Sequence, residues 1–132
     1  MRSDLPVTKL AENVYLLNEF DGTNCYLVVG SEKALLIDCG TGFCDIRGAA
    51  EKLTDLPIIL AATHGHGDHI GGHARIKELA PQIRTACIEQ AAPALRDPAA
   101  NAVRIRTKYP RFSPPPQCYL RGVEPDRVLR DG

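Results

Sequence analysis

The sequence has no net charge, no long apolar run and no leader-like segment. Its 132 residues include 16 Lys and Arg against 16 Asp and Glu, and 44% of them are hydrophobic, which argues against a disordered chain. No apolar run approaches the roughly 18 residues that a membrane-spanning helix needs. Residues 1–9 mix charge with proline and lack the apolar stretch of a signal peptide. We therefore expect one globular, cytoplasmic domain with no membrane partner.

The cysteines also lack a functional pattern. They form no C-x-x-C pair and lie at Cys25, Cys39, Cys44, Cys87 and Cys118. An odd count without an export signal favours reduced thiols. We expect these side chains to be small buried hydrophobic groups rather than redox or metal-binding ones.

Most of the chain alternates between strand-like and helix-like segments. Apolar runs bounded by turns predict strands at residues 13–18, 25–29, 34–37, 58–62 and 85–88. Apolar residues at helical spacing predict helices over residues 43–54 and 73–80, with a short helix over 89–95 that Pro93 breaks. The run at 58–62 is apolar throughout, which predicts burial on both faces. The order of these elements predicts an α/β fold.

Residues 96–122 differ in character from the rest, and we expect them to form an irregular, partly extended excursion. They are rich in proline, and basic side chains alternate with apolar ones around Arg104 to Phe112. A basic patch could bind an anionic substrate or nucleic acid, but a solvated loop with apolar anchors is the simpler interpretation. The charge of the two halves, −4 for residues 1–66 and +4 for residues 67–132, is too mild to indicate nucleic acid by itself.

A dense group of metal-binding residue types follows the strand at 58–62. His64, His66, Asp68 and His69 form an H-x-H-x-D-H pattern with glycine at both x positions. Transition metals need several nitrogen or oxygen donors that converge on one point. Two histidines two residues apart in an extended segment point the same way, and the turn at Gly67 can redirect the next two donors. The cluster therefore predicts a metal site where a buried strand ends.

Two nearby residues are ambiguous. His73 lies on the same predicted helical face as Ile76 and Ala80, so we expect it to be partly buried or to support the site rather than to bind metal. Asp38 ends the strand at 34–37 in a Gly-rich turn. Its carboxylate could hydrogen-bond a metal-binding histidine or cap the turn through backbone N–H groups.

The segments Thr63-His-Gly-His-Gly-Asp-His-Ile-Gly-Gly72 and Leu35-Leu-Ile-Asp-Cys-Gly40 resemble motifs of the metallo-β-lactamase superfamily. The resemblance covers residues 12–90. It implies the N-terminal half of an αβ/βα sandwich, an α/β fold with a mixed sheet and helices on one face. Residues 123–132 resemble the start of that family's second half, so residues 1–132 are expected to form one incomplete domain.

The resemblance also implies a role for each residue. His64 and His66 would bind one metal ion, Asp68 and His69 a second, and Asp38 would support them. A metal-bound hydroxide would attack an ester, thioester, lactone or amide of a small-molecule substrate, and Asp68 would orient or deprotonate the water. Zinc is the expected ion, in one or two copies, while Fe and Mn suit the same donors. A glyoxalase II-like or lactonase-like enzyme is the leading interpretation.

No histidine follows His73, although the family's second half supplies three more ligands. We therefore expect the 132-residue chain to be a fragment that is inactive alone, that needs the missing half, or that dimerises through its uncovered surfaces. Two alternatives remain open. One is a mononuclear iron persulfide dioxygenase on the same fold, and the other is a non-catalytic or nucleic-acid-binding module completed by a partner chain.

Overall fold

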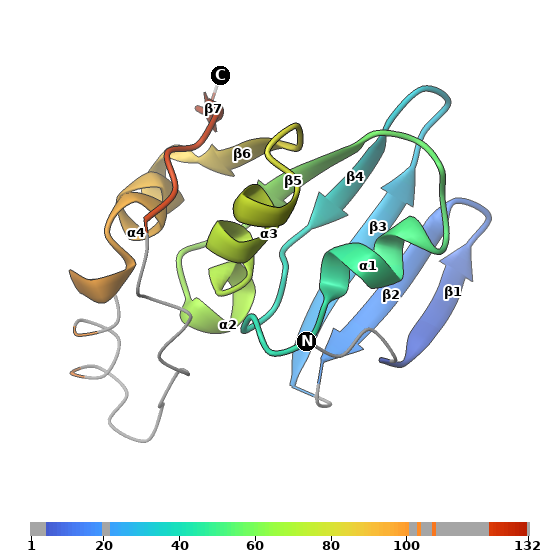
Figure 1. Cartoon of the computed structure of the whole chain (residues 1–132), viewed down its shortest axis with the longest axis horizontal. Helices are drawn as coiled ribbons and strands as arrows, with labels where there is room; N and C mark the ends of the chain where they lie inside the picture. The colour runs from blue at the N-terminus through green and yellow to red at the C-terminus, as the bar shows by residue number, and fades with distance from the viewer. Residues whose placement is uncertain (1–4, 20–21, 101–102, 104–106, 108–121, 132) are drawn as a thin grey trace.

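The computed structural model of the chain describes residues 5–19, 22–100, 103, 107 and 122–131, apart from the side chains of residues 67 and 68. Seven strands form one mixed sheet in the order of the sequence. They are β1 (Val7–Ala11), β2 (Val14–Glu19), β3 (Thr23–Val29), β4 (Ala34–Ile37), β5 (Ile58–Ala62), β6 (Arg84–Ile88) and β7 (Arg127–Leu129). The strands from β1 to β4 are antiparallel, and those from β4 to β7 are parallel (Figure 1).

The helices lie on one face of this sheet (Figure 1). They are α1 (Ile46–Glu51), α2 (Gly67–Ile70), α3 (His73–Leu79) and α4 (Ala92–Arg96), the last preceded by a 3-10 turn at Glu89–Ala91. None of the helices in the described residues has the length and apolarity that a bilayer span requires. The expected α/β architecture, with a mixed sheet and helices on one face, is confirmed.

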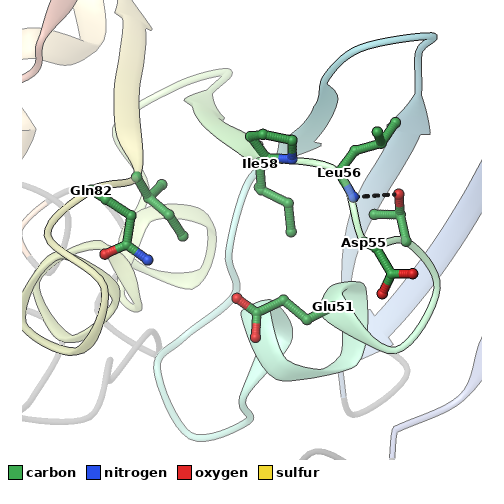
Figure 2. Close-up of a pocket in the computed structure, with 8 residues that line it drawn as sticks. Glu51, Asp55, Leu56, Ile58 and Gln82 are labelled. Carbon is green, nitrogen blue, oxygen red and sulfur yellow. Dashed lines mark hydrogen bonds between the residues drawn. The ribbon is translucent and has the colours of Figure 1, made fainter.

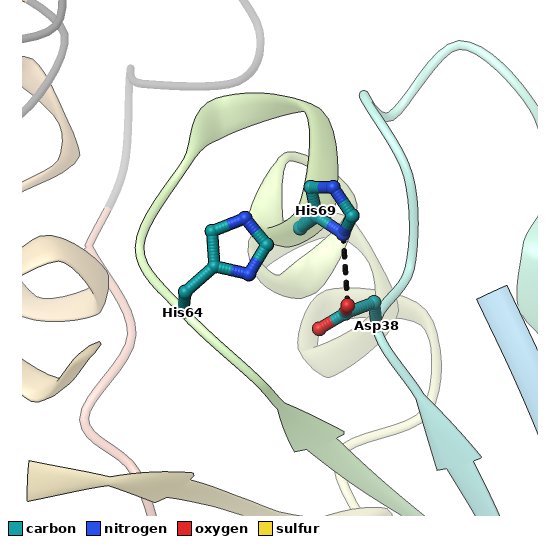
Figure 3. Close-up of side chains that lie close together, drawn as sticks. All are labelled: Asp38, His64 and His69. Carbon is teal, nitrogen blue, oxygen red and sulfur yellow. Dashed lines mark hydrogen bonds and ion pairs between the residues drawn. The ribbon is translucent and has the colours of Figure 1, made fainter. Parts of the chain in front are cut away.

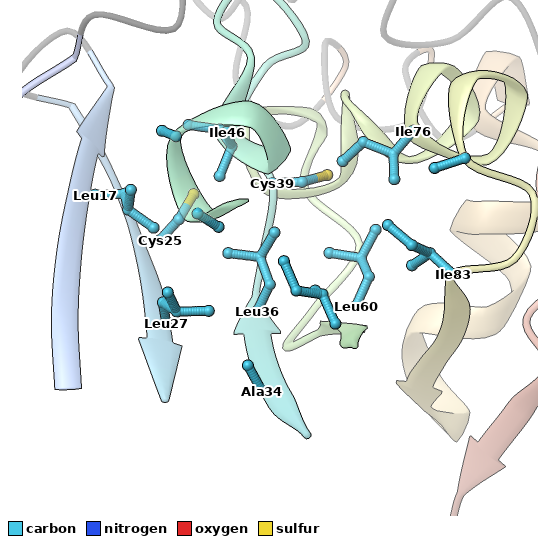
Figure 4. Packing of buried hydrophobic residues seen from close by; sticks show 14 of the residues in the cluster. Leu17, Cys25, Leu27, Ala34, Leu36, Cys39, Ile46, Leu60, Ile76 and Ile83 are labelled. Carbon is cyan, nitrogen blue, oxygen red and sulfur yellow. The ribbon is translucent and has the colours of Figure 1, made fainter. Parts of the chain in front are cut away.

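The core lies between the sheet and the helices. Alternate residues of the strands point toward α1 and α3, and Leu36 and Leu60 at the centre are almost fully buried. Figure 4 shows these side chains beneath Ile46 of α1 and Ile76 of α3. A second, smaller cluster packs α4 against the ends of β5 and β6. Burial of apolar area against both sets of helices is the main stabilising contribution.

The opposite face of the sheet is only partly covered. Leu35 and Ile37 of β4 and Ile59 and Ala61 of β5 are half-buried, while their neighbours along each strand are buried. The prediction that residues 58–62 are buried on both faces was therefore wrong for the described part of the chain. A strand that is apolar at every position faces helices on one side and leaves an apolar surface on the other.

Several boundaries differ from the sequence prediction for local reasons. Helix α1 begins at Ile46 because the Asp45 side chain accepts the N–H of Gly48 and caps the first turn. Pro93 lies in the first turn of α4, where a missing N–H costs nothing, so it starts that helix rather than breaking one. Strand β1 is exposed at every position and carries no burial pattern that a sequence could reveal.

The proline-rich region is not uniformly irregular. Residues 98–100, 103 and 107 are helical, and the Asp97 side chain accepts the N–H of Ala100 at 3.1 Å, as a helix cap does. The expectation of an extended excursion is thus wrong for these residues. The basic positions Arg104, Arg106, Lys108 and Arg111 lie outside the described residues.

The one-sided core predicts unequal costs for two adjacent leucines. Leu36→Ala in the 132-residue chain should lower the free energy of unfolding by about 2–5 kcal/mol, because it leaves a cavity among buried side chains. Leu35→Ala, on the half-exposed face, should cost about 1 kcal/mol. Urea denaturation measures both. Equal losses would contradict the description of a single covered face.

Candidate metal centre

The candidate site lies where two parallel strands end. Asp38 directly follows β4, and His64 follows β5. These two strands are paired, with Ile37 of β4 opposite Ala61 of β5. The N–H of Asp38 donates to Ala61 O at 2.8 Å, which extends the strand pairing to the site. Helix α2 then returns the chain so that His69 faces Asp38 (Figure 3). The geometry follows from the rule that carboxyl ends of parallel strands share one edge.

Three of these side chains converge. One ligand atom from each of Asp38, His64 and His69 lies within 4.8 Å of the others. The ring centroids of His64 and His69 are 4.1 Å apart. Histidine nitrogens at such separations, with a carboxylate beside them to orient the rings, suit a transition metal.

Hydrogen bonds fix which nitrogen of each ring carries the proton. Thr63 Oγ1 donates to Asp38 Oδ2 at 2.7 Å, so this hydroxyl must accept from Nδ1–H of His64, 2.8 Å away. His69 Nδ1–H donates to the same Asp38 oxygen at 2.8 Å. In its neutral form, each ring therefore carries its proton on Nδ1 and leaves Nε2 unprotonated. This is the tautomer that a metal ion needs from a histidine ligand.

Asp38, which accepts these hydrogen bonds, is buried and has an unusual backbone conformation. It is 4% exposed, and its φ of 64° lies in the left-handed region that few non-glycine residues adopt. Burial raises the pKa of this carboxyl, but the hydrogen bonds from His69 and Thr63 outweigh burial and hold the pKa below its ordinary value. A charged Asp38 can therefore orient both rings at neutral pH.

The other two predicted ligands are placed differently. His66 is exposed, precedes α2 as its N-cap residue, and lies edge-on to His64 with ring centroids 4.8 Å apart. It is outside the convergent group of three. The backbone of Asp68 lies in α2, and its side chain falls outside the described part. The roles of His66 and Asp68 as ligands thus stay predictions.

His73 is buried behind the site, as expected. It is 1% exposed, and its Nδ1 lies 2.9 Å from Cys39 Sγ. Its Nε2 has no hydrogen-bond partner among the described residues. Desolvation lowers the pKa of His73 to about 4. The four described cysteines are also buried and free, while Cys118 lies outside the described residues.

Thr63 is the member of the site that sequence reasoning missed. Its backbone N–H and its hydroxyl both bind the Asp38 carboxylate, 25 positions earlier in the chain. A hydroxyl residue between a buried strand and a histidine cluster is a weak signal. The pairing of β4 with β5 is what brings Thr63 next to Asp38.

A cavity elsewhere carries none of this chemistry. It lies near the start of β5, between α1 and the beginning of β6, so β5 separates it from the donors (Figure 2). The lining side chains are acidic, hydroxyl, amide and aliphatic, with no histidine or cysteine. The donors, rather than this cavity, define the candidate site.

Two histidines and a carboxylate that converge at the ends of parallel strands form a candidate metal-binding group in an α/β fold. Residues 18–131 match the metallo-beta-lactamase superfamily, and the chain belongs to that family. The expected membership is confirmed.

Individual relatives agree with this assignment. An atrochrysone carboxyl ACP thioesterase from Aspergillus chevalieri is 36% identical over 72 residues, which cover 52% of this chain and 23% of the thioesterase. A native metallo-beta-lactamase from Legionella gormanii superposes with a TM-score of 0.73 at 22% identity, over 100% of this chain and 49% of the lactamase. A class B3 di-zinc metallo-beta-lactamase from an Alaskan soil metagenome gives a TM-score of 0.72 at 21% identity, over 95% of this chain and 46% of that chain. The chain thus spans at most about half the length of these relatives.

The Thr63 hydroxyl is predicted to control metal affinity. Thr63→Val removes the hydrogen bonds to Asp38 and His64 and should weaken metal binding about 10- to 100-fold, the usual cost of losing a partner of a ligating histidine. Thr63→Ser keeps the hydroxyl and should bind as the native chain does. Competition with a chromophoric chelator measures both. Equal affinity of the Val variant and the native chain would refute the tautomer argument.

The buried neutral His73 predicts an acid-sensitive fold. The unfolded chain binds a proton at His73 below pH 6.5, but the folded chain does so only near pH 4, so stability should fall as the pH drops through this window. The loss is about 3 kcal/mol from this group. Urea denaturation in chelator, for the native chain and His73→Gln, measures it. The variant should show a shallower pH dependence, and an identical slope would contradict a neutral His73.

Proposed function

We propose that this chain carries the metal-binding part of a hydrolase that cleaves an ester, thioester, lactone or amide bond. The observation that carries the proposal is the Asp38–Thr63 network, which engages Nδ1 of both His64 and His69 and so orients the two rings at the ends of β4 and β5. A bound divalent cation would supply a water of lowered pKa and a Lewis acid for the carbonyl group. Family membership supports this chemistry.

The residues divide the work. His64 and His66 would hold one ion, and His69 and Asp68 a second. The Asp38 carboxylate orients the His69 ring through Nδ1 and the His64 ring through the Thr63 hydroxyl. His66 is exposed and lies edge-on to His64. Asp68 would also orient the attacking water or accept its proton. In this proposal the ion is zinc, in one or two copies, and the structural similarity to a class B3 di-zinc metallo-beta-lactamase supports two.

A thioester or ester is the favoured substrate class. Two of the relatives that match this chain are named atrochrysone carboxyl ACP thioesterases. A thioester carbonyl is a good electrophile whose thiolate leaves without prior protonation, so a single activated water suffices. The free buried cysteines support a reducing, cytoplasmic location.

Two ions need more donors than the described residues bring together. We propose that the remaining ligands come from a second half of the same fold or from a second copy of the chain. The half-buried apolar face of β4 and β5 supports this, because such a surface gains stability when another element covers it.

Metal content and hydrolysis test the proposal together. A protein that includes the second half of the fold should contain one or two zinc ions per chain, and His64→Ala/His66→Ala should lose them. The rate of hydrolysis of a panel of thioesters, esters and lactones should fall more than about 100-fold in that variant. Loss of a residue that only hydrogen-bonds a metal ligand already lowers activity about 10- to 100-fold. His73→Gln serves as the matched histidine control and should keep its metal.

Three outcomes contradict the proposal. Full metal retention in the double variant would refute the ligand assignment. Iron content with oxygen consumption on a glutathione persulfide would indicate the dioxygenase. Salt-sensitive nucleic-acid binding that survives His64→Ala would indicate a binding module.

A further inference from the structure

Glu19 is a buried carboxylate at a position where the strand pattern calls for an apolar side chain. It follows Tyr15 and Leu17 on the face of β2 that packs against the core, and it is 1% exposed. A carboxylate in such a place needs hydrogen-bond donors that compensate for lost water. The hydrogen bonds of the Glu19 side chain therefore indicate its role.

Both oxygens of Glu19 hold the loop that follows β4. Oε1 accepts the backbone N–H of Thr41 at 2.7 Å, and Oε2 accepts that of Cys44 at 3.2 Å. Gly40, at a φ of 73°, packs against the carboxylate so closely that a Cβ there would lie 2.8 Å from both oxygens. The loop from residue 39 to residue 44 is thus seated on Glu19.

The other side of this loop contacts the turn that carries His69. The N–H of Cys39 donates to His69 O at 2.9 Å, and the N–H of Gly71 donates to Gly40 O at 2.9 Å. A Cβ at Gly72 would lie 2.8 Å from Cys39 O. The loop therefore fills the space between Glu19 and the donor turn, with little room for either to shift.

Asp38 begins this loop in its left-handed conformation. Such a backbone persists only where surrounding contacts over-determine it. Glu19 holds the loop through the backbone N–H groups of Thr41 and Cys44. The turn that carries His69 holds it through the N–H of Cys39. These contacts restrict the position of the Asp38 carboxylate.

We propose that Glu19 is a positioning residue of the metal site. It contacts neither the donors nor the ion, but it holds the loop from which Asp38 orients His64 and His69. This rests on the metal site of the proposed function and adds a residue to it. Without Glu19, the loop gains freedom and both rings lose their fixed tautomer.

Metal affinity of the 132-residue chain tests the role. Glu19→Gln keeps the shape but turns an amide N–H toward one backbone N–H, and it should weaken Co²⁺ binding about 10-fold; Glu19→Ala should weaken it further, toward 100-fold. Co²⁺ titration followed by its visible absorption reports both affinity and geometry. The matched control is Ile58→Ala, a core residue at the start of β5, which should lower thermal stability without changing Co²⁺ affinity.

A second readout needs no metal. Long-range ¹H–¹⁵N spectra of the metal-free chain should show single Nε2-unprotonated tautomers for His64 and His69 in the native protein and mixed tautomers in Glu19→Ala. Unchanged affinity and tautomers in both Glu19 variants would overturn the inference, as would an equal loss of affinity in Ile58→Ala. Weakened Co²⁺ binding in the Glu19 variants, together with no hydrolysis by a protein that includes the second half of the fold, would support Glu19's role while refuting the proposed function.

Discussion

The hydrogen bonds of one carboxylate organise the site. Asp38 accepts from the Thr63 backbone, the Thr63 hydroxyl and the His69 ring, and each bond decides the state of a group beyond it. The Thr63 hydroxyl sets the tautomer of His64, and the hydrogen bond from His69 Nδ1 to Asp38 sets the tautomer of His69. Because the carboxylate is buried, these bonds are stronger than they would be in water and cannot be exchanged for solvent.

The fold makes this arrangement possible through strand order. Strands β4 and β5 are parallel neighbours at the change from antiparallel to parallel pairing, so their carboxyl ends deliver Asp38 and Thr63 to one point. The short helices α1 and α3 cover one face of the sheet (Figure 1). The site lies beyond the carboxyl ends of β4 and β5. The sheet therefore acts as a rigid frame, and the loops that follow its strands carry the chemistry.

The sequence could predict what is local and not what depends on pairing. The H-x-H-x-D-H cluster concentrates four donors in six residues, and strands such as Ala34–Ile37 and Ile58–Ala62 were found at their observed bounds. Asp38 stayed ambiguous because a carboxylate after a strand caps turns as readily as it binds side chains. Thr63 and Glu19 were missed because their partners lie 22 to 25 residues away. Strand β1 was missed because exposure at every position leaves no periodic signal.

The acidic balance of the first half illustrates the same limit in terms of charge. Residues 1–66 contain nine acidic side chains, a number that invites an interpretation as solvated surface. Glu19, Asp38 and Asp45 instead each accept backbone N–H groups inside the fold. These three carboxylates lie at the end of a strand, the start of a loop and the start of a helix, where chain connections leave donors unpaired. Their hydrogen bonds therefore stabilise these three chain connections, and the count of acidic residues says little about what the outer surface attracts.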